Sequence, residues 1–334
     1  VEAMRQAGRR VSLLHPGVDA REFRPATAEE RAALRKAAGL PENAYVVGMF
    51  AVNQGRKAIS LTMEGFAEFC KDKPEALLYL DMEAGSGAGW DIGKLVRAVG
   101  LDPKRVFVKA QVLPKLPGLR ERYCICDVMS QLAHREGWGL PISEGMACAV
   151  PQIALDWCAP SEQLADGRGC LVPCLKQSNG KDYMPIGTWG GARDAHPDMP
   201  AYLNILNRLY HDKPFREYTA WTGQKWAVEQ TWDKSADQLE AVLNEAVRKK
   251  KAVASSAPPP APVPRPPETL QPPRSDDGGQ VNPMAGVPSV SMTPVPTYPD
   301  VVNGATMMPT SPNPPDAPID LTDLIPLTQG EKKR

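Results

Sequence analysis

The chain has 334 residues, of which 42% are hydrophobic, and its 39 basic side chains balance 39 acidic ones. Because phosphate neutralisation needs clustered lysine and arginine, zero net charge without a large basic block excludes a protein held on nucleic acid in this way. No uninterrupted apolar stretch approaches the ~20 residues of a membrane helix, so we expect no membrane span.

The chain begins at Val1 without an initiator methionine. Its first residues also lack the basic segment followed by an apolar segment that is typical of a signal peptide. We therefore expect the N-terminus to be cut from a longer sequence.

Residues 10–250 alternate short apolar runs with longer amphipathic segments, a pattern typical of parallel strands joined by crossover helices. The expected strands span residues 10–14, 44–51, 76–81, 105–109, 125–130, 151–155 and 169–172. The expected helices span residues 58–72, 91–99, 116–124, 142–148, 201–210, 214–230 and 233–249. The pattern predicts one α/β domain, a Rossmann-like parallel sheet with helices on both faces, within the usual size range of a domain.

Residues 251–334 hold 20 of the 35 prolines and one aromatic side chain, Tyr298. Such a segment buries too little apolar surface to offset the entropy of ordering it, so we expect a disordered proline-rich tail. Its Pro-x-x-Pro spacings could dock an adaptor domain, and residues 319–325 could fold on a partner; an unstructured segment is the simpler interpretation.

Seven cysteines are scattered through apolar segments, which favours reduced thiols in a cytoplasmic protein over a disulfide framework. The pairs Cys124 with Cys126 and Cys170 with Cys174 lack the Cys-x-x-Cys spacing of a zinc ribbon. We therefore expect no metal site and no catalytic cysteine.

The loop after the expected strand 125–130 is the richest in functional signals, because parallel sheets bind ligands at the carboxyl ends of their strands. Gly137 and Gly139 allow the backbone to approach a ligand closely, and Pro141 suits the first turn of a helix. Amides near Gly139 and Leu140 would then point from a helix N-terminus at an anion such as a phosphate.

Two carboxylates, Glu136 and Glu144, bracket this turn and could accept hydrogen bonds from the hydroxyls of a sugar or a ribose. The acid and nucleophile pair of a hydrolase is disfavoured, because a helix N-terminus favours the ionised form of the nearby carboxylate. Taken alone, the pair would more simply be a solvated loop charge and a helix-start charge.

The segment from Glu136 to Glu144 resembles the Glu-x7-Glu signature of GT-B glycosyltransferases of the family-4 retaining type, written E-G-F-G-L-P/S-x-x-E-A-M-A-x-G-x-P. Gly-Trp-Gly-Leu-Pro follows the first glutamate, and Trp138 takes the aromatic position of the signature. Gly145 stands in place of the alanine and Ala149 in place of the glycine before the final Val-Pro.

Further motifs extend the resemblance over residues 10–249. Residues 17–19 resemble the Gly-Val-Asp at the start of the family's donor-binding domain. Residues 159–162 resemble its G-x-x-E motif with alanine for glycine, and residues 169–172 resemble its G-x-L-V motif. Residues 231–233 resemble the start of its terminal helix.

The resemblance also implies how the donor diphosphate is bound. In the family, a lysine that usually has an arginine five residues before it reaches this diphosphate from the loop that residues 53–57 occupy here. Lys57 matches the lysine, Val52 stands where the arginine is expected, and the adjacent Arg56 can substitute for it. Fixed cations of this kind stabilise the negative charge that develops on the departing diphosphate, so no metal or other cofactor is required.

By the resemblance, Glu136 would bind hydroxyls of the donor sugar, Glu144 would bind the ribose, and the amides near Gly139 and Leu140 would contact the phosphates. We assign catalytic roles to Glu136, Lys57 and Arg56 and donor-binding roles to Asn53, Gly137, Trp138, Gly139, Leu140 and Glu144.

The resemblance implies the C-terminal half of a GT-B fold, a retaining glycosyltransferase that transfers a sugar from a nucleotide-diphosphate sugar to an unspecified acceptor. Residues 1–9 would be the end of an interdomain linker helix, residues 10–250 the donor-binding domain and residues 251–334 the tail. The acceptor domain would be absent from this chain. The alternative is a non-catalytic nucleotide-sugar-binding module tethered to a partner through the proline-rich tail.

The glycine-rich segment 85–89 suggests a second class, a nicotinamide oxidoreductase. Its third glycine, Gly89, comes one residue too early for the dinucleotide fingerprint, so this interpretation fails on spacing. The family resemblance places this loop near the donor nucleotide base.

Overall fold

The computed structural model describes residues 8, 11–85, 89–178, 180–185 and 193–256. The predicted linker helix over residues 1–9 and the predicted disorder of the proline-rich tail beyond Ser256 lie outside the described residues. The fold below concerns the compact unit that reaches Lys249.

Six parallel strands form one sheet in the order β3-β2-β1-β4-β5-β6. They are β1 (Tyr45–Phe50), β2 (Ala76–Asp81), β3 (Val106–Val108), β4 (Val128–Gln131), β5 (Gln152–Leu155) and β6 (Cys170–Val172). The strand order reverses between β1 and β4, which are neighbours in the sheet although two strands and several helices separate them in the chain. The predicted Rossmann-like parallel sheet is confirmed.

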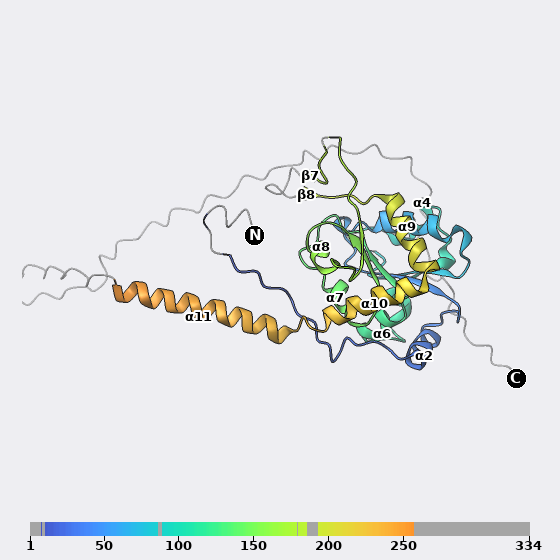
Figure 1. Ribbon diagram of the computed structural model, residues 1–334. Coiled ribbons are helices and arrows are strands. Elements are labelled where there is room, and N and C mark those ends of the chain that lie inside the picture. The colour runs from blue at the N-terminus through green and yellow to red at the C-terminus, as the bar shows by residue number, and fades with distance from the viewer. Residues whose placement is uncertain (1–7, 9–10, 86–88, 179, 186–192, 257–334) are drawn as a thin grey trace, which may run out of the picture. The chain divides into compact units, whose positions relative to one another are not determined.

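Every residue of β1 is buried, because helices cover both faces of the sheet (Figure 1). Val47 and Met49 face one core, whereas Val46 and Phe50 face the other. The first core includes side chains of α3 (Ile59–Phe69), α4 (Ile92–Ala98) and α9 (Met199–His211). The second includes side chains of α6 (Leu119–Cys124), α7 (Leu140–Ala147) and α10 (Lys213–Ala227). The two-sided burial explains why these strands are continuous apolar runs in the sequence.

The remaining elements are shorter or lie at the edges of the domain. They are α2 (Ala28–Ala38), α5 (Lys109–Val112), α8 (Ala159–Gln163), α11 (Trp232–Ser256), the 3-10 turns η1 (Gly55–Lys57), η2 (Cys70–Asp72) and η3 (Pro103–Arg105), and the antiparallel pair β7 (Met184–Pro185) and β8 (Arg193–Asp194). Helix α11 continues past the expected helix end at Lys249 and the expected domain end at residue 250.

The strand expected over residues 10–14 is wrong for its described part, residues 11–14, which have no regular structure. Leu13 and Leu14 are 51% and 37% exposed, so their apolar side chains do not contribute a strand face to the core. Val18, a few residues further along, instead contacts the rest of the domain through its backbone, since its N–H donates a hydrogen bond to Gln230 O at 2.7 Å.

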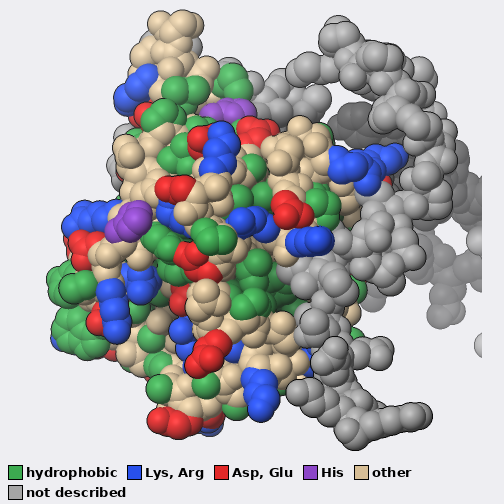
Figure 2. Space-filling model, turned by 90° about the vertical axis from the view of Figure 1, so that its right-hand side faces the viewer, with side chains coloured by type: hydrophobic (Ala, Val, Ile, Leu, Met, Phe, Trp, Pro, Cys, Tyr) green, Lys and Arg blue, Asp and Glu red, His purple; other side chains and the backbone are tan. Residues whose placement is uncertain are grey.

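The charges on one face of the described residues are mixed. On the face seen in Figure 2, lysine and arginine side chains alternate with aspartate and glutamate rather than gathering into one patch. None of the helices in the described ranges combines the length and the apolar composition that crossing a bilayer requires.

Helix α2 is tied to the sheet by a buried carboxylate at the amino end of β4. Asp127 accepts hydrogen bonds from Arg31 at 2.9 Å, from Arg35 at 2.5 Å and from the Val46 N–H at 2.7 Å. The side chains of Asp127 and Arg35 are only 13% and 12% exposed. Breaking such a pair leaves an unpaired charge inside the protein, which is strongly unfavourable.

We predict that Asp127→Ala lowers the free energy of unfolding by about 3–5 kcal/mol, because Arg35 would stay buried without its anion. Urea denaturation followed by circular dichroism measures the change. Asp19→Ala is the control, since Asp19 pairs with Arg21, whose side chain is 93% exposed, and should have no measurable effect. Equal losses in the two variants would contradict the prediction.

Candidate functional site

The predicted site residues follow β1 and β4, the two strands at which the strand order reverses. Lys57 ends the turn η1 after β1, and Glu136 lies in the loop between β4 and α7. The two loops are joined by a hydrogen bond from the His134 N–H to Arg56 O at 2.9 Å. The carboxyl edge of a parallel sheet at such a reversal is where α/β proteins bind ligands.

The three residues with predicted catalytic roles lie together. Lys57 Nζ forms an ion pair with Glu136 Oε2, and the two side chains are 9% and 11% exposed. Arg56 Nη1 lies 3.6 Å from the same oxygen and donates to Arg135 O at 3.4 Å. Two cations therefore share one carboxylate, and the excess positive charge favours an anionic ligand.

The start of α7 adds backbone donors to the same loop. Gly139 caps the helix with φ +92°, and a Cβ there would lie 3.1 Å from Ile142 Cδ1 and 3.2 Å from Glu136 Cγ. The positive φ therefore favours glycine at this position, and a Cβ would also press on these two side chains. No side chain hydrogen-bonds at this cap, and the first amides of a helix lack an acceptor one turn back. Here Pro141 has no N–H and the Ile142 N–H donates to Gly139 O at 2.9 Å, which leaves the N–H of Leu140 for a ligand. Such amides bind phosphates and other anions.

Gly137 is different, because nothing lies within 4 Å of the position that its Cβ would take. The residue is exposed and lines the cavity described below. Packing alone therefore does not explain a glycine here.

Glu144 lies one turn further along α7. Tyr123 Oη donates a hydrogen bond to Glu144 Oε2 at 2.7 Å. Burial raises the pKa of the Glu144 carboxyl above its ordinary value, and the hydrogen bond from Tyr123 opposes this rise by stabilising the carboxylate. Desolvation is the larger of these two effects, so the net shift opposes the ionised form of Glu144, whereas the helix start alone was expected to favour that form.

Asn53 lies beside the site but its side chain holds a neighbouring loop. Its Nδ2 donates to Glu83 O at 3.0 Å and to Trp90 O at 2.7 Å, and its Oδ1 accepts from the Trp90 N–H at 2.8 Å. Asn53 is 3% exposed. It therefore joins the end of β1 to both ends of the glycine-rich loop that was predicted to lie near the nucleotide base.

Trp138 packs and lines a cavity at the same time. Its indole stacks on His15 with ring centroids 4.6 Å apart. The side-chain nitrogen of Gln163 donates a hydrogen bond to Trp138 O at 2.9 Å, and its side-chain oxygen accepts one from Trp138 Nε1 at 3.2 Å. This is the amide orientation that satisfies both groups. Neither His15 nor Gln163 was expected to contribute to the site.

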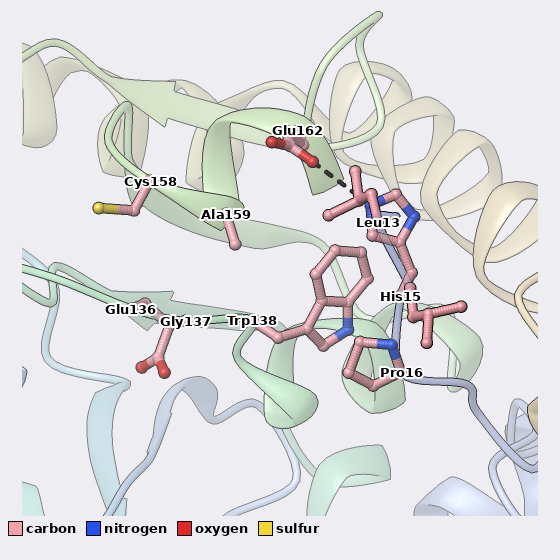
Figure 3. A pocket seen from close by; sticks show the side chains of 10 residues that line it. Leu13, His15, Pro16, Glu136, Gly137, Trp138, Cys158, Ala159 and Glu162 are labelled. Carbon is pink, nitrogen blue, oxygen red and sulfur yellow. Dashed lines mark ion pairs between the residues drawn. The ribbon is translucent and has the colours of Figure 1, made fainter. Parts of the chain in front are cut away.

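The cavity has a volume of about 480 Å³ and is lined by Leu13, Leu14, His15, Pro16, Glu136, Gly137, Trp138, Cys158, Ala159 and Glu162. In Figure 3 the Glu136 carboxylate lies at the opposite end from the His15 ring, whose Nε2 is 3.5 Å from Glu162 Oε2. Cys158, with φ +59°, takes a backbone conformation that glycine adopts more readily. Glu162 could have been found from the sequence, because it ends the G-x-x-E motif.

Within the described ranges, no group of three or more histidine, cysteine, aspartate or glutamate side chains is arranged to hold a metal ion.

Residues 30–180 match the family model described as glycosyl transferases group 1. The D-inositol 3-phosphate glycosyltransferase of Salinispora arenicola is 27% identical over 248 residues, which cover 71% of this chain and 50% of the relative. The enzyme of the same name from Kribbella flavida is 31% identical over 172 residues, which cover 49% and 39%. The chain spans about half the length, or less, of these relatives.

Solved structures share the fold. Anabaena Alr3699/HepE in complex with UDP-glucose aligns with a TM-score of 0.57 at 19% identity, covering 73% of this chain and 61% of that one. Sucrose-phosphate synthase from Thermosynechococcus elongatus aligns with a TM-score of 0.56 at 19% identity, covering 74% and 56%. The family match confirms the predicted resemblance to glycosyl transferases group 1. The solved structures confirm the fold.

We predict that Tyr123→Phe raises the pKa of Glu144 further, because the phenol donates its hydrogen bond to the carboxylate form. NMR titration of the side-chain carboxyl carbons, with Glu144→Gln used for assignment, measures the shift. Tyr79→Phe is the matched control, since Tyr79 donates instead to Asp81 at 2.6 Å. An unchanged or lowered pKa of Glu144 in Tyr123→Phe would show that the hydrogen bond does not stabilise the carboxylate.

Proposed function

We propose that this chain, whose residues 30–180 belong to the glycosyl transferases group 1 family, is the donor-binding part of a retaining glycosyltransferase that uses a nucleotide-diphosphate sugar. One observation carries the proposal: Lys57, Arg56 and the N-terminus of α7 converge at the carboxyl ends of β1 and β4. Cations and backbone donors together suit the charge and the acceptor oxygens of a diphosphate.

The same groups would assist the reaction. Transfer of the sugar leaves negative charge on the departing diphosphate, and the transition state therefore gains more from fixed positive groups than the bound donor does. One such preorganised donor is worth ~3 kcal/mol. Lys57 and Arg56 supply the charge in our proposal, so the reaction requires neither a metal ion nor another cofactor.

The ion pair between Lys57 and Glu136 has a role before the donor binds. Glu136 neutralises the buried lysine, whose charge would otherwise be costly. When the donor binds, Lys57 turns to the diphosphate and the Glu136 carboxylate accepts hydrogen bonds from the sugar hydroxyls. Glu144, held by Tyr123, contacts the ribose.

The retaining outcome and the acceptor site extend the proposal beyond this domain. The spacing of Glu136 and Glu144 is that of the retaining family-4 signature. We place the acceptor site on a separate N-terminal domain, and the greater length of the relatives supports this. All seven cysteines are free in the structure, which supports a reducing, cytoplasmic compartment for the reaction.

Isothermal titration calorimetry of the 334-residue chain with UDP, GDP and ADP tests the donor site. We expect at least one nucleotide to bind, and Lys57→Ala to weaken its binding by about 1.5–3 kcal/mol, or ~10- to 150-fold, through loss of a charged hydrogen bond. Glu144→Ala should also weaken binding, through loss of the ribose contact.

Lys71→Ala is the control, because it also removes one lysine charge but at a position outside the proposed site. Lys71 is 68% exposed and pairs with Glu68, so its loss should leave nucleotide affinity unchanged. If none of the three nucleotides binds, or if Lys57→Ala binds as tightly as the parent chain, the donor-site assignment is wrong.

A further inference from the structure

The segment 193–198, which begins with β8 and leads into α9, contacts the loop between β4 and α7. The Ala195 N–H donates a hydrogen bond to His134 O at 3.1 Å, and Ala195 is buried. Arg135 Nη1 forms an ion pair with Asp194 Oδ1 at 2.5 Å. Neither the family motifs nor the proposed donor site includes this segment, so its contacts with the loop need their own explanation.

The His134 side chain makes a second contact with the same backbone. Its Nδ1 lies 2.8 Å from Ala195 O. Because a carbonyl oxygen only accepts hydrogen bonds, Nδ1 carries a proton and is the donor. The His196 ring also packs against the His134 ring, with centroids 4.4 Å apart. The segment 193–198 therefore holds His134 through both its backbone and its side chain.

The segment 193–198 is itself held at the edge of the sheet. The Leu175 N–H donates to His196 O at 2.7 Å, and the Asp198 N–H donates to Pro173 O at 2.9 Å. Pro173 and Leu175 follow β6, which is an edge strand of the sheet. The loop between β4 and α7 is therefore connected to this edge by a segment that has contacts on both sides.

His134 and Arg135 connect this support to the cations of the proposed donor site. The His134 N–H donates to Arg56 O at 2.9 Å, and Arg56 Nη1 donates to Arg135 O at 3.4 Å. The next residue after Arg135 is Glu136, which forms the ion pair with Lys57. A shift of this loop therefore changes the position of the Arg56 guanidinium relative to Glu136.

We propose that His134, Asp194 and Ala195 are positioning residues of the donor site. They act through the two loops and fix Arg56 and Glu136 for the diphosphate and the sugar, an inference that rests on the proposed function. Groups held in place before a ligand binds need no rearrangement when it arrives. The affinity gained from the second phosphate, which Arg56 contacts, depends on these residues, whereas the affinity gained from the base and the ribose does not.

Calorimetry of the 334-residue chain with a nucleoside diphosphate and its monophosphate tests this role. The probes are UDP and UMP, GDP and GMP, and ADP and AMP, and the pair whose diphosphate binds the parent chain is compared. We expect His134→Ala to weaken diphosphate binding by about 2- to 12-fold, the value of one hydrogen bond, and to leave monophosphate binding unchanged. Equal losses for the two ligands, or no loss for the diphosphate, would overturn the proposal.

A conservative variant separates the lost hydrogen bond from the lost ring. The amide nitrogen of asparagine is as many bonds from Cβ as Nδ1 of histidine, so His134→Asn can still donate to Ala195 O. We expect His134→Asn to restore the diphosphate affinity that His134→Ala loses. Melting temperatures check that both variants fold. If the asparagine variant binds the diphosphate as weakly as the alanine variant does, the hydrogen bond to Ala195 has no positioning role.

Asp194→Asn tests the ion pair with Arg135. We expect it to weaken diphosphate binding by about 2- to 5-fold, as for a partly exposed ion pair, and to leave monophosphate binding unchanged. Asp182→Ala is the matched control, because Asp182 also lies between β6 and α9 but pairs with Lys176, and it should change neither affinity. Equal losses of diphosphate affinity in the two variants would contradict a specific role of Asp194.

Hydrogen exchange tests the positioning without any nucleotide. Mass spectrometry of peptides that cover residues 131–138 follows the amides of the loop in the ligand-free chain. We expect faster exchange in His134→Ala than in the parent chain and recovery in His134→Asn, and unchanged exchange in His134→Ala would overturn the proposal. If the parent chain binds none of the three diphosphates, the proposed function fails, whereas the exchange rates still decide whether His134 holds the loop.

Discussion

A lysine ammonium buried at the carboxyl edge of a parallel sheet needs an anion beside it, and the site is organised around this requirement. Glu136 meets it for Lys57, although strands β2, β3 and β4 lie between the two residues in the sequence. The strand order brings them together, because β1 and β4 are neighbours and the loops after them are joined through His134 and Arg56. The fold therefore sets the charge of the site before any ligand is present.

Two further features make the pair a binding site rather than a structural ion pair. Arg56 leaves the cluster with more positive than negative charge, and the α7 N-terminus supplies backbone donors beside it. Glu144 extends the site along α7 and depends on α6 for its partner, Tyr123.

The apolar runs predicted most of the sheet, because buried strands are continuous apolar runs. The family resemblance, whose motifs occur in order along the chain, predicted that Lys57, Arg56 and Glu136 belong to one site. Helix α2 was missed, although Thr27 and Glu30 form a capping box that the sequence contains. Two features were not predictable, because they depend on contacts between distant segments. They are the hydrogen bonds from Asn53 to Glu83 and Trp90 and the packing of Trp138 against His15. The raised pKa of Glu144 was not predictable either, because burial depends on the tertiary structure.

The most direct measurement is a crystal structure of this chain with the nucleoside diphosphate that it binds. We expect Lys57 Nζ to lie within ~3.2 Å of a phosphate oxygen and Glu136 to have released Lys57. A nucleotide bound elsewhere, or bound with the Lys57–Glu136 ion pair intact, would contradict the central claim that this pair gives way to the donor diphosphate.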